Sequence, residues 1–206
     1  MYIIHKQGFT QVTDRLTEGG GKSIRDFLSI ADLLEQPQLA RIYAYLYREG
    51  EATVSELIDA LDLSQGTAYT YANQLTDASV LTPTTDTQPQ RYAAVEIELT
   101  LTVDGDREYT ISPTLIAAVA RRATDDTIDS YIDRHGVHGL ATALSHTIAR
   151  EQGETTHRLI ADDLDISELE AEVILQALQP IVREHFSVED SGASLADVVD
   201  AENLDV

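Results

Sequence analysis

The sequence predicts a mainly α-helical protein with a small antiparallel β-hairpin, and three observations lead to this fold class. Apolar residues recur at helical spacing through most of the chain, for example over residues 37–49. Cap chemistry and a tight turn divide residues 53–76 into two short helices. Residues 95–103 alternate between apolar and polar side chains, and the hairpin signal Asp104-Gly105 follows them directly.

The composition indicates a folded protein and excludes several classes of chemistry. The 206 residues suffice for one medium domain or two small ones, and 43% of them are hydrophobic. There is no cysteine, which excludes a disulfide framework, a cysteine-based zinc ribbon and a thiol nucleophile. No stretch approaches the roughly 18 apolar residues of a membrane span, and the opening residues form too short an apolar run for a secretory signal. We therefore expect a cytoplasmic protein with no membrane partner.

The net charge is strongly negative and constrains the choice of partners. Lys and Arg number 14 against 36 Asp and Glu, which gives −22, and only Lys6 and Lys22 are lysines. Such a charge repels DNA in ordinary salt, but in molar salt the Debye length falls to about 3 Å and net charge hardly acts at a distance. Scarce lysine, an acidic surface and small core residues resemble the proteins of extremely halophilic archaea. Residues 1–50 carry six bases and six acids, so this part of the chain is the least acidic.

Helix signals dominate the first half of the chain. Residues 23–36 have apolar side chains at helical spacing, and Pro37 suits the first turn of the next helix. Thr53 is a predicted N-cap, with Glu56 completing a capping box. After a short turn, Ser64 is predicted to cap a further helix. Two short helices joined by a tight turn, with a third helix before them, form a helix-turn-helix unit.

A predicted strand pair follows this unit. Residues 82–90 have turn chemistry throughout. Residues 91–103 then form a predicted half-buried strand, whose side chains alternate from Val95 to Val103. Asp104-Gly105 predicts a hairpin, with residues 107–112 as the partner strand. A wing consists of two strands joined by a flexible loop, and it follows the helix-turn-helix unit directly. The predicted elements have this order.

The C-terminal half is predicted to be helical and to contain a repeat of the earlier unit. Residues 113–123, 125–136 and 137–153 form three helical segments. A shift of 103 positions then aligns GEATVSELIDALDLS, from Gly50, with GETTHRLIADDLDIS, from Gly153, without a gap. This agreement has two interpretations: a second helix-turn-helix-like unit, or cap chemistry that any two helices share. The second helix of such a unit carries three glutamates and is a poor neighbour for phosphate, so the unit would be structural or dock a protein.

These patterns divide the chain into four parts. Residues 1–30 are an N-terminal arm and lead-in helix. Residues 31–112 are the helix-turn-helix domain with an extended β-hairpin, and residues 113–190 are a helical C-terminal domain. Residues 191–206 are an acidic tail.

A resemblance to a known family rests on residues 33–81, which read LLEQPQLARIYAYLYREGEATVSELIDALDLSQGTAYTYANQLTDASVL. This stretch, continued by the strand start Arg91-Tyr92, resembles the winged helix-turn-helix core that ArsR-like and TrmB-like archaeal and bacterial regulators share. The resemblance covers residues 31–95, close to a third of the chain. It is fairly specific for the fold and much less so for any sensed ligand.

The resemblance implies that Ser64–Thr76 is a recognition helix lying in the major groove of double-stranded DNA. Asn and Gln side chains pair bidentately with adenine, Thr methyl groups touch thymine methyls, and Tyr hydroxyls suit phosphates. A glycine lets the backbone approach the duplex closely. The residues expected to contact DNA are Ser64, Gln65, Gly66, Thr67, Tyr69, Thr70, Asn73 and Gln74, together with Arg91 of the wing.

The charge pattern of the recognition helix has two interpretations. The helix carries no charge before Asp77, in a chain of which 24% is charged, and this gap favours a nucleic-acid face. Alternatively, small polar residues simply fill the exposed side of a helix. Most members of the family carry lysine or arginine on this helix and this chain has none, so hydrogen bonds and shape would have to replace phosphate contacts that weaken in high salt.

Two further surfaces are weaker candidates for DNA contact. The loop of the wing is rich in Thr and Gln, with Arg91 as its one cation and Asp86 as its one acid. Wings usually reach the minor groove or flanking phosphates, but an exposed polar loop explains the composition almost as well. In the N-terminal arm four cations suggest a backbone clamp, although acids interleave with them: Lys6, Arg15, Lys22 and Arg25.

Enzyme and metal chemistry find little support in the sequence. His135, His138 and His146 lie near Asp129 and Asp133, but their spacing matches no standard zinc pattern. No phosphate-cradling glycine loop, GxSxG elbow or HExxH motif occurs. We therefore expect no enzyme activity, no metal and no cofactor.

The function expected from these observations is sequence-specific DNA binding by a transcriptional regulator that acts as a homodimer at promoters. Residues 113–150 and 95–103 are the expected dimer surfaces. The basal transcription machinery is a further expected partner. The alternative is a winged-helix protein-interaction module of that machinery that does not itself read DNA.

Overall fold

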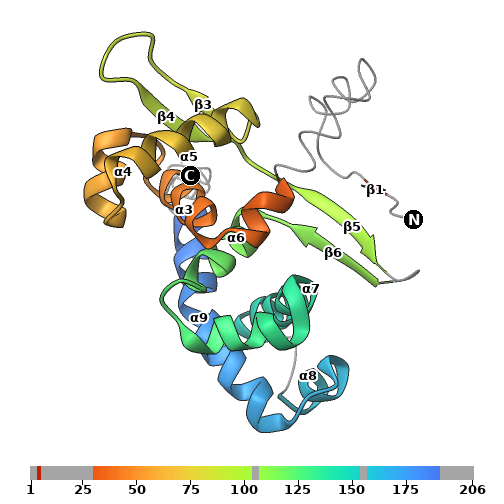
Figure 1. The fold of residues 1–206 in the computed structure, drawn as a ribbon. Coiled ribbons are helices and arrows are strands. Elements are labelled where there is room, and N and C mark those ends of the chain that lie inside the picture. Colours follow the sequence, from red (N-terminus) through yellow and green to blue (C-terminus); the bar gives the residue numbers. More distant parts are fainter. Residues whose placement is uncertain (1–3, 6–29, 104–106, 154–156, 191–206) are drawn as a thin grey trace, which may run out of the picture.

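The computed structural model describes residues 4–5, 30–103, 107–153 and 157–190, and it is mainly helical (Figure 1). Residues 30–35 are helical. The helices that follow are α3 (Pro37–Glu49), α4 (Val54–Leu61), α5 (Gln65–Asp77), α6 (Pro113–Arg121), α7 (Asp126–Glu151), α8 (His157–Leu164) and α9 (Glu168–Asp190). Together with two small antiparallel sheets, they confirm the predicted class of a mostly α protein with little β-structure.

Two predicted features fall outside the described residues. The four cations of the N-terminal arm all lie between residues 6 and 29. The acidic tail, residues 191–206, also lies outside. Of the arm, only the short strand β1 (Ile4–His5) is described.

The first sheet joins the segment before α4 to the hairpin after α5. Its strands are β2 (Ala52–Thr53), β3 (Leu81–Pro83) and β4 (Arg91–Ala94), in the order β2-β4-β3. Both pairings are antiparallel, and Tyr92 of β4 stands between Ala52 on one side and Pro83 on the other. In Figure 1 the β3–β4 hairpin projects from the upper end of the molecule, next to α5.

The second sheet contains the hairpin that the Asp-Gly signal predicted. Strands β5 (Leu99–Val103) and β6 (Arg107–Ile111) pair antiparallel, with Leu99 opposite Ile111, and β1 pairs with the other edge of β5. The turn itself, residues 104–106, lies outside the described residues.

The prediction of one continuous strand over residues 91–103 is wrong. The chain leaves the first sheet after Ala94 and enters the second at Leu99. Between them the Val95 carbonyl accepts a hydrogen bond of 2.9 Å from the hydroxyl of the buried Tyr43, while the Val95 amide donates to the Val80 carbonyl. Alternating side chains indicate one buried face but do not identify the pairing partner. The β3–β4 hairpin and the β5–β6 hairpin therefore belong to different sheets.

The predicted caps of α4 and α5 are confirmed. The Thr53 hydroxyl accepts from the Glu56 amide at 3.2 Å, and the Glu56 carboxylate accepts from the Thr53 amide at 2.7 Å. The Ser64 hydroxyl accepts from the Thr67 amide at 3.2 Å. Asp62, in a left-handed conformation with φ of 52°, turns the chain between the two helices. Local chemistry thus sets the bounds of both helices.

The C-terminal helices pack on the first helices through α6. Leu115, Ile116 and Val119 of α6 are fully buried, in one continuous core that runs from Leu33 to Val182 of α9. Seven of the nine residues of α6 are buried. The prediction that residues 113–150 offer a dimer surface is therefore wrong for α6, whose apolar face is covered within the protomer.

The long helix α7 contains an interruption at the end of a predicted segment. Gly136 has φ of 70° and ψ of 178°, so its backbone is not helical. Two predicted segments, 125–136 and 137–153, thus lie end to end in one element. In Figure 1, α7, α8 and the first part of α9 form the lower end of the molecule, and α9 then rises toward α6 and α3. Within the described residues no helix is long and apolar enough to cross a membrane.

The two segments related by 103 positions have matching helix bounds and turns. Helix α4 spans residues 54–61 and α8 spans 157–164, while α5 begins at residue 65 and α9 at residue 168. Asp62 and Asp165, in the two turns, have φ of 52° and 53°. The glycines that precede the segments match as well, with φ of 84° at Gly50 and 78° at Gly153.

The hydrogen bonds of the two turns also agree. The Leu63 amide donates to the Ile58 carbonyl at 3.2 Å, and the Ile166 amide donates to the Ala161 carbonyl at 3.1 Å. The two donors are 103 residues apart, and so are the two acceptors. The segments diverge afterwards, since α5 has 13 residues and α9 has 23.

Candidate nucleic-acid interface

Helix α5 presents the predicted recognition residues on one side and buries the other. Ala68, Ala72 and Leu75 are buried against the core. Six of the predicted residues are exposed, namely Ser64, Gln65, Gly66, Tyr69, Thr70 and Asn73, whereas Thr67 and Gln74 are half-buried. Tyr69 is 49% exposed, one of few large apolar side chains on the described surface.

Several polar groups on α5 already have partners within the protein. The hydroxyls of Ser64 and Thr67 lie 2.8 Å apart, and Ser64 also caps the helix. The Thr70 hydroxyl donates to the Gly66 carbonyl at 2.8 Å. The amide nitrogen of Gln74 is 3.5 Å from an Asp32 carboxylate oxygen. These contacts leave methyl groups rather than free donors at the two threonines.

Three of the predicted contact side chains on α5 make no hydrogen bond within the part of the chain that the structure describes: Gln65, Tyr69 and Asn73. They recur at intervals of four residues, so they follow one another along a single face of the helix. Gln65 and Asn73 each offer an amide that both donates and accepts, and Tyr69 offers a hydroxyl. A row of this kind suits the edges of bases more than the interior of a protein.

Gly66 is not required by the packing of the protein itself. A methyl group at this position would meet no other atom within 4 Å. Its backbone is helical, so no left-handed conformation calls for glycine either. The absence of a side chain here brings the helix backbone nearer to whatever lies against this face.

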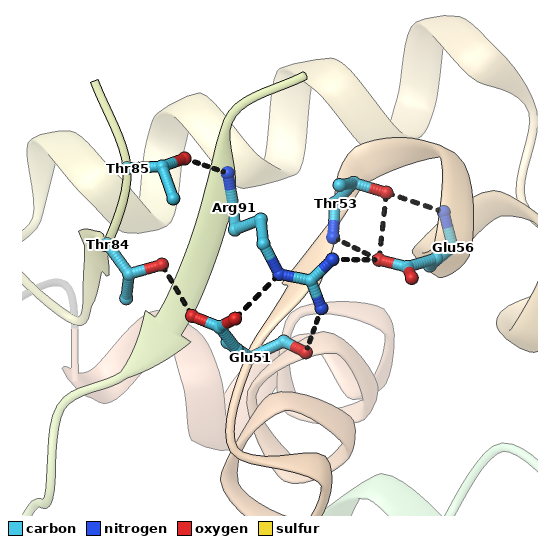
Figure 2. Close-up of polar contacts among 6 residues, drawn as sticks. All are labelled: Glu51, Thr53, Glu56, Thr84, Thr85 and Arg91. Carbon is cyan, nitrogen blue, oxygen red and sulfur yellow. Dashed lines mark hydrogen bonds and ion pairs between the residues drawn. The ribbon is translucent and has the colours of Figure 1, made fainter. Parts of the chain in front are cut away.

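Arg91, the remaining predicted DNA contact, lies in a network of polar contacts at the base of the β3–β4 hairpin (Figure 2). Its Nε lies 2.8 Å from Glu51 Oε1, and a terminal nitrogen lies 3.3 Å from Glu56 Oε2. A second terminal nitrogen donates to the Glu51 carbonyl at 3.0 Å. The structure therefore holds Arg91 on the segment before α4, apart from the exposed row on α5.

Two threonines of the hairpin complete this network. The Thr84 hydroxyl donates to Glu51 at 2.7 Å, and the Arg91 amide donates to the Thr85 hydroxyl at 3.0 Å. The Thr84 hydroxyl, followed by Arg91, lowers the pKa of Glu51. The Thr53 amide and hydroxyl, followed by Arg91, lower the pKa of Glu56. Sequence reasoning missed Glu51 because it lies forty residues from Arg91 and only the β2–β4 pairing brings the two together.

Four of the five histidines and aspartates considered for a metal site have separate partners. His135 lies 3.1 Å from Glu170, and His146 lies 2.7 Å from Asp163. Asp129 and Asp133 both pair with Arg122. Among the described residues, no group of three or more potential ligands lies together.

Comparison with known proteins gives one match, to a family of unknown function (DUF7437) over residues 122–187. This stretch covers α7, α8 and most of α9 and amounts to roughly a third of the chain. No curated protein and no solved structure matches the chain. The similarity therefore lies in the C-terminal helices and does not include the α5 face.

Proposed function

We propose that this chain is a sequence-specific DNA-binding transcriptional regulator built on a winged helix-turn-helix, with α5 as its recognition helix. The order α3-β2-α4-α5-β3-β4, with a sheet ordered β2-β4-β3, supports this proposal because the two final strands form a hairpin directly after α5. In this arrangement α5 enters the major groove and the β3–β4 hairpin is the wing.

The observation that carries the proposal is the uncharged face of α5. Gln65, Tyr69 and Asn73 are exposed and make no hydrogen bond among the described residues, in a chain with a net charge of −22. This face carries no charge before Asp77, the last residue of α5, which is unusual in so acidic a protein. In a salt-rich cytoplasm, hydrogen bonds to base edges are less weakened by salt than phosphate contacts are.

We further propose a homodimer, because a helix-turn-helix dimer reads two half-sites that mirror its own symmetry. The sequence predicts dimer surfaces over residues 113–150 and 95–103. Because α6 is buried, the exposed side of α7 and the strand β5 are the parts of them that remain for the dimer contact. The repeated α8–α9 unit is proposed as a second helix-turn-helix-like unit. Its second helix exposes Glu168 and Glu172, so this unit serves packing or protein contact rather than DNA.

A second candidate function is favoured by one observation. Helix α5 carries no cation, and Arg91 is paired with Glu51 and Glu56. The phosphate contacts that usually supply much of the affinity are therefore missing from this face. A winged helix that docks a subunit of the basal transcription machinery, without reading DNA, would have the same features.

Selection from a random duplex library in about 2 M KCl distinguishes these two functions, because long-range repulsion is screened at that salt concentration. We expect the full chain to enrich a two-fold symmetric sequence, and fluorescence anisotropy then measures its affinity. Replacement of Gln65 and Asn73 by alanine should reduce the preference for that sequence about tenfold or more, as the loss of a bidentate base contact does.

The matched control is Gln176→Ala, which changes an exposed glutamine of α9 at the position equivalent to Asn73. It should leave sequence preference unchanged. Enrichment of no sequence, or an unaltered preference in the double variant, contradicts the DNA-binding proposal and favours the docking function.

A further inference from the structure

A cavity of about 260 Å³ lies where α3, α6 and α9 meet, beside the end of α4. Residues from both the first helices and the C-terminal helices line it. The apolar part of the wall consists of aliphatic side chains, among them Ala44, Ala117 and Ile181. Two tyrosines, Tyr45 and Tyr47, add aromatic surface. The cavity is thus mostly apolar, with room for a molecule larger than a few waters.

Three arginines converge on this cavity, in a chain where bases are scarce. Arg41 and Arg48 come from α3, and Arg121 comes from the end of α6. Glu184 of α9 lies 3.2 Å from Arg48 and 3.4 Å from Arg121 and is the one carboxylate in the lining. Arg48 also pairs with Glu49, at 2.8 Å. Among the described residues, three guanidinium groups therefore face two carboxylates, so the positive groups outnumber the negative ones there.

Arg41 is the member of this set that lacks a carboxylate. One of its terminal nitrogens donates to Gln38 at 2.8 Å, and the other donates to the Leu61 carbonyl at 2.9 Å. No carboxylate lies within ion-pair distance of it in the described part of the chain. A guanidinium has five N–H donors in a planar fork that matches a carboxylate. Arg41 therefore has donors available for an anion.

We propose that this cavity binds a small organic carboxylate with an apolar ring, held by Arg41. The carboxylate accepts from the Arg41 guanidinium, and the ring packs against the alanines and tyrosines of the wall. A cavity of about 150 Å³ accommodates benzene, so the volume here suits one ring with a short acidic arm. This ligand site goes beyond the proposed DNA binding, and its test uses no DNA, so each proposal can fail without the other.

The position of Arg41 links such a ligand to the turn before α5. Leu61 is the last residue of α4, and the turn of residues 62–64, which ends at the α5 cap Ser64, follows it directly. A carboxylate that engages the remaining donors of Arg41 draws on the guanidinium that also binds the Leu61 carbonyl. Occupancy of the cavity therefore acts on a contact that fixes α3 to the end of α4.

The test uses 4-fluorophenylacetate, observed by ¹⁹F NMR with the full chain in about 2 M KCl, with 4-fluorophenylacetamide as the neutral counterpart. For a ligand of this size we expect a dissociation constant of about 1 mM. The amide should bind at least about tenfold more weakly, because it lacks the charge that Arg41 pairs with. A second acid, 4,4-difluorocyclohexanecarboxylate, tests an aliphatic ring.

Two variants and one control locate the site. Arg41→Met removes the guanidinium and should weaken binding of the acid about tenfold or more. Ala117→Leu keeps Arg41 but fills part of the cavity, so it should also abolish binding. Arg183→Met, which alters an arginine paired with Glu151 outside the cavity, should bind as the unaltered chain does.

Circular dichroism and thermal unfolding verify that each variant is folded. If Arg41→Met does not fold, Ala117→Leu still decides the outcome. The proposal is overturned if neither acid binds at about 10 mM, if acid and amide bind equally, or if folded Ala117→Leu binds as the unaltered chain does.

Discussion

The guanidinium of Arg91 and the carboxylate of Glu51 lie 2.8 Å apart and join the base of the β3–β4 hairpin to the segment before α4. Both side chains are partly exposed, at 32% and 47%. Exposed ion pairs of this kind contribute little to stability. The more important effect of the pair is on function, because it occupies the one cation that the hairpin offers to a phosphate.

Glu51→Gln is expected to strengthen DNA binding. The change removes one negative charge and leaves Arg91 with Glu56 as its remaining carboxylate, so the guanidinium becomes available to a phosphate. We expect the affinity to rise about threefold and the salt dependence to steepen by about one phosphate contact. Fluorescence anisotropy over a range of KCl concentrations measures both. Glu49→Gln makes the same charge change at a residue that pairs with Arg48, and an equal rise in that control would assign the effect to net charge alone.

The same network predicts how stability depends on acid pH. The pKa values of Glu51 and Glu56 are lowered in the folded chain from the ordinary value of 4.5. A carboxyl group whose pKa is lowered by folding stabilises the folded state at any pH above its ordinary pKa. This contribution is lost as the pH falls through the pKa of the folded state. Urea unfolding, measured from neutral pH to below 4.5, gives the decrease in the free energy of unfolding caused by acid. This decrease, the acid loss, should be smaller for Glu51→Gln than for the unaltered chain.

The control for the pH experiment is Glu172→Gln. Glu172 is exposed on α9 and forms no ion pair among the described residues. Its replacement should leave the acid loss as it is in the unaltered chain. An acid loss that is unchanged in Glu51→Gln would mean that the network does not persist in solution.

Gly66→Ala is expected to separate stability from DNA binding. A methyl group at residue 66 has no neighbour within 4 Å, and alanine is favoured over glycine in helices by up to about 1 kcal/mol. The free energy of unfolding should therefore rise slightly, as measured in urea. The methyl group would nevertheless stand on the face proposed to approach DNA, so affinity should fall. A variant that is more stable and binds DNA equally well would show that the backbone at Gly66 makes no close approach.

The caps of α5 and α9 should contribute equally to stability. Ser64 accepts from the Thr67 amide at 3.2 Å, and Ser167 accepts from the Glu170 amide at 3.1 Å. Replacing either serine by alanine should lower the free energy of unfolding by about 1 kcal/mol. Ser145→Ala, within α7, removes only a bond to the Ala141 carbonyl and should change stability by less than about 0.5 kcal/mol. A loss at Ser64 without one at Ser167 would contradict the equivalence of the two units.

The features that sequence reasoning predicted well depend on local chemistry. The capping box of Thr53 and Glu56 joins residues three positions apart, so its pattern can be read directly from the sequence. The same holds for the 103-residue offset, because each matched turn is a local structure. The exposed row on α5 follows from helical spacing once the cap at Ser64 is recognised.

The features that escaped prediction depend on contacts between distant residues. The break at Val95 depends on the hydroxyl of Tyr43, 52 residues earlier. The pairing of Arg91 depends on the register of β4 against β2. The burial of α6 depends on the position of α3 and α9, and its own apolar spacing fits a dimer surface equally well. Periodicity shows which side of an element is apolar, but not which surface covers that side.

The burial of α6 between the first helices and α9 has a consequence for dissection of the chain. A fragment ending at residue 112 would lose Leu115, Ile116 and Val119 and would uncover the apolar side of α3 that they pack against. Truncation at residue 112 would therefore produce a fragment that aggregates rather than a minimal DNA-binding domain. A shortened version intended for study has to retain α6 and the part of α9 that covers it.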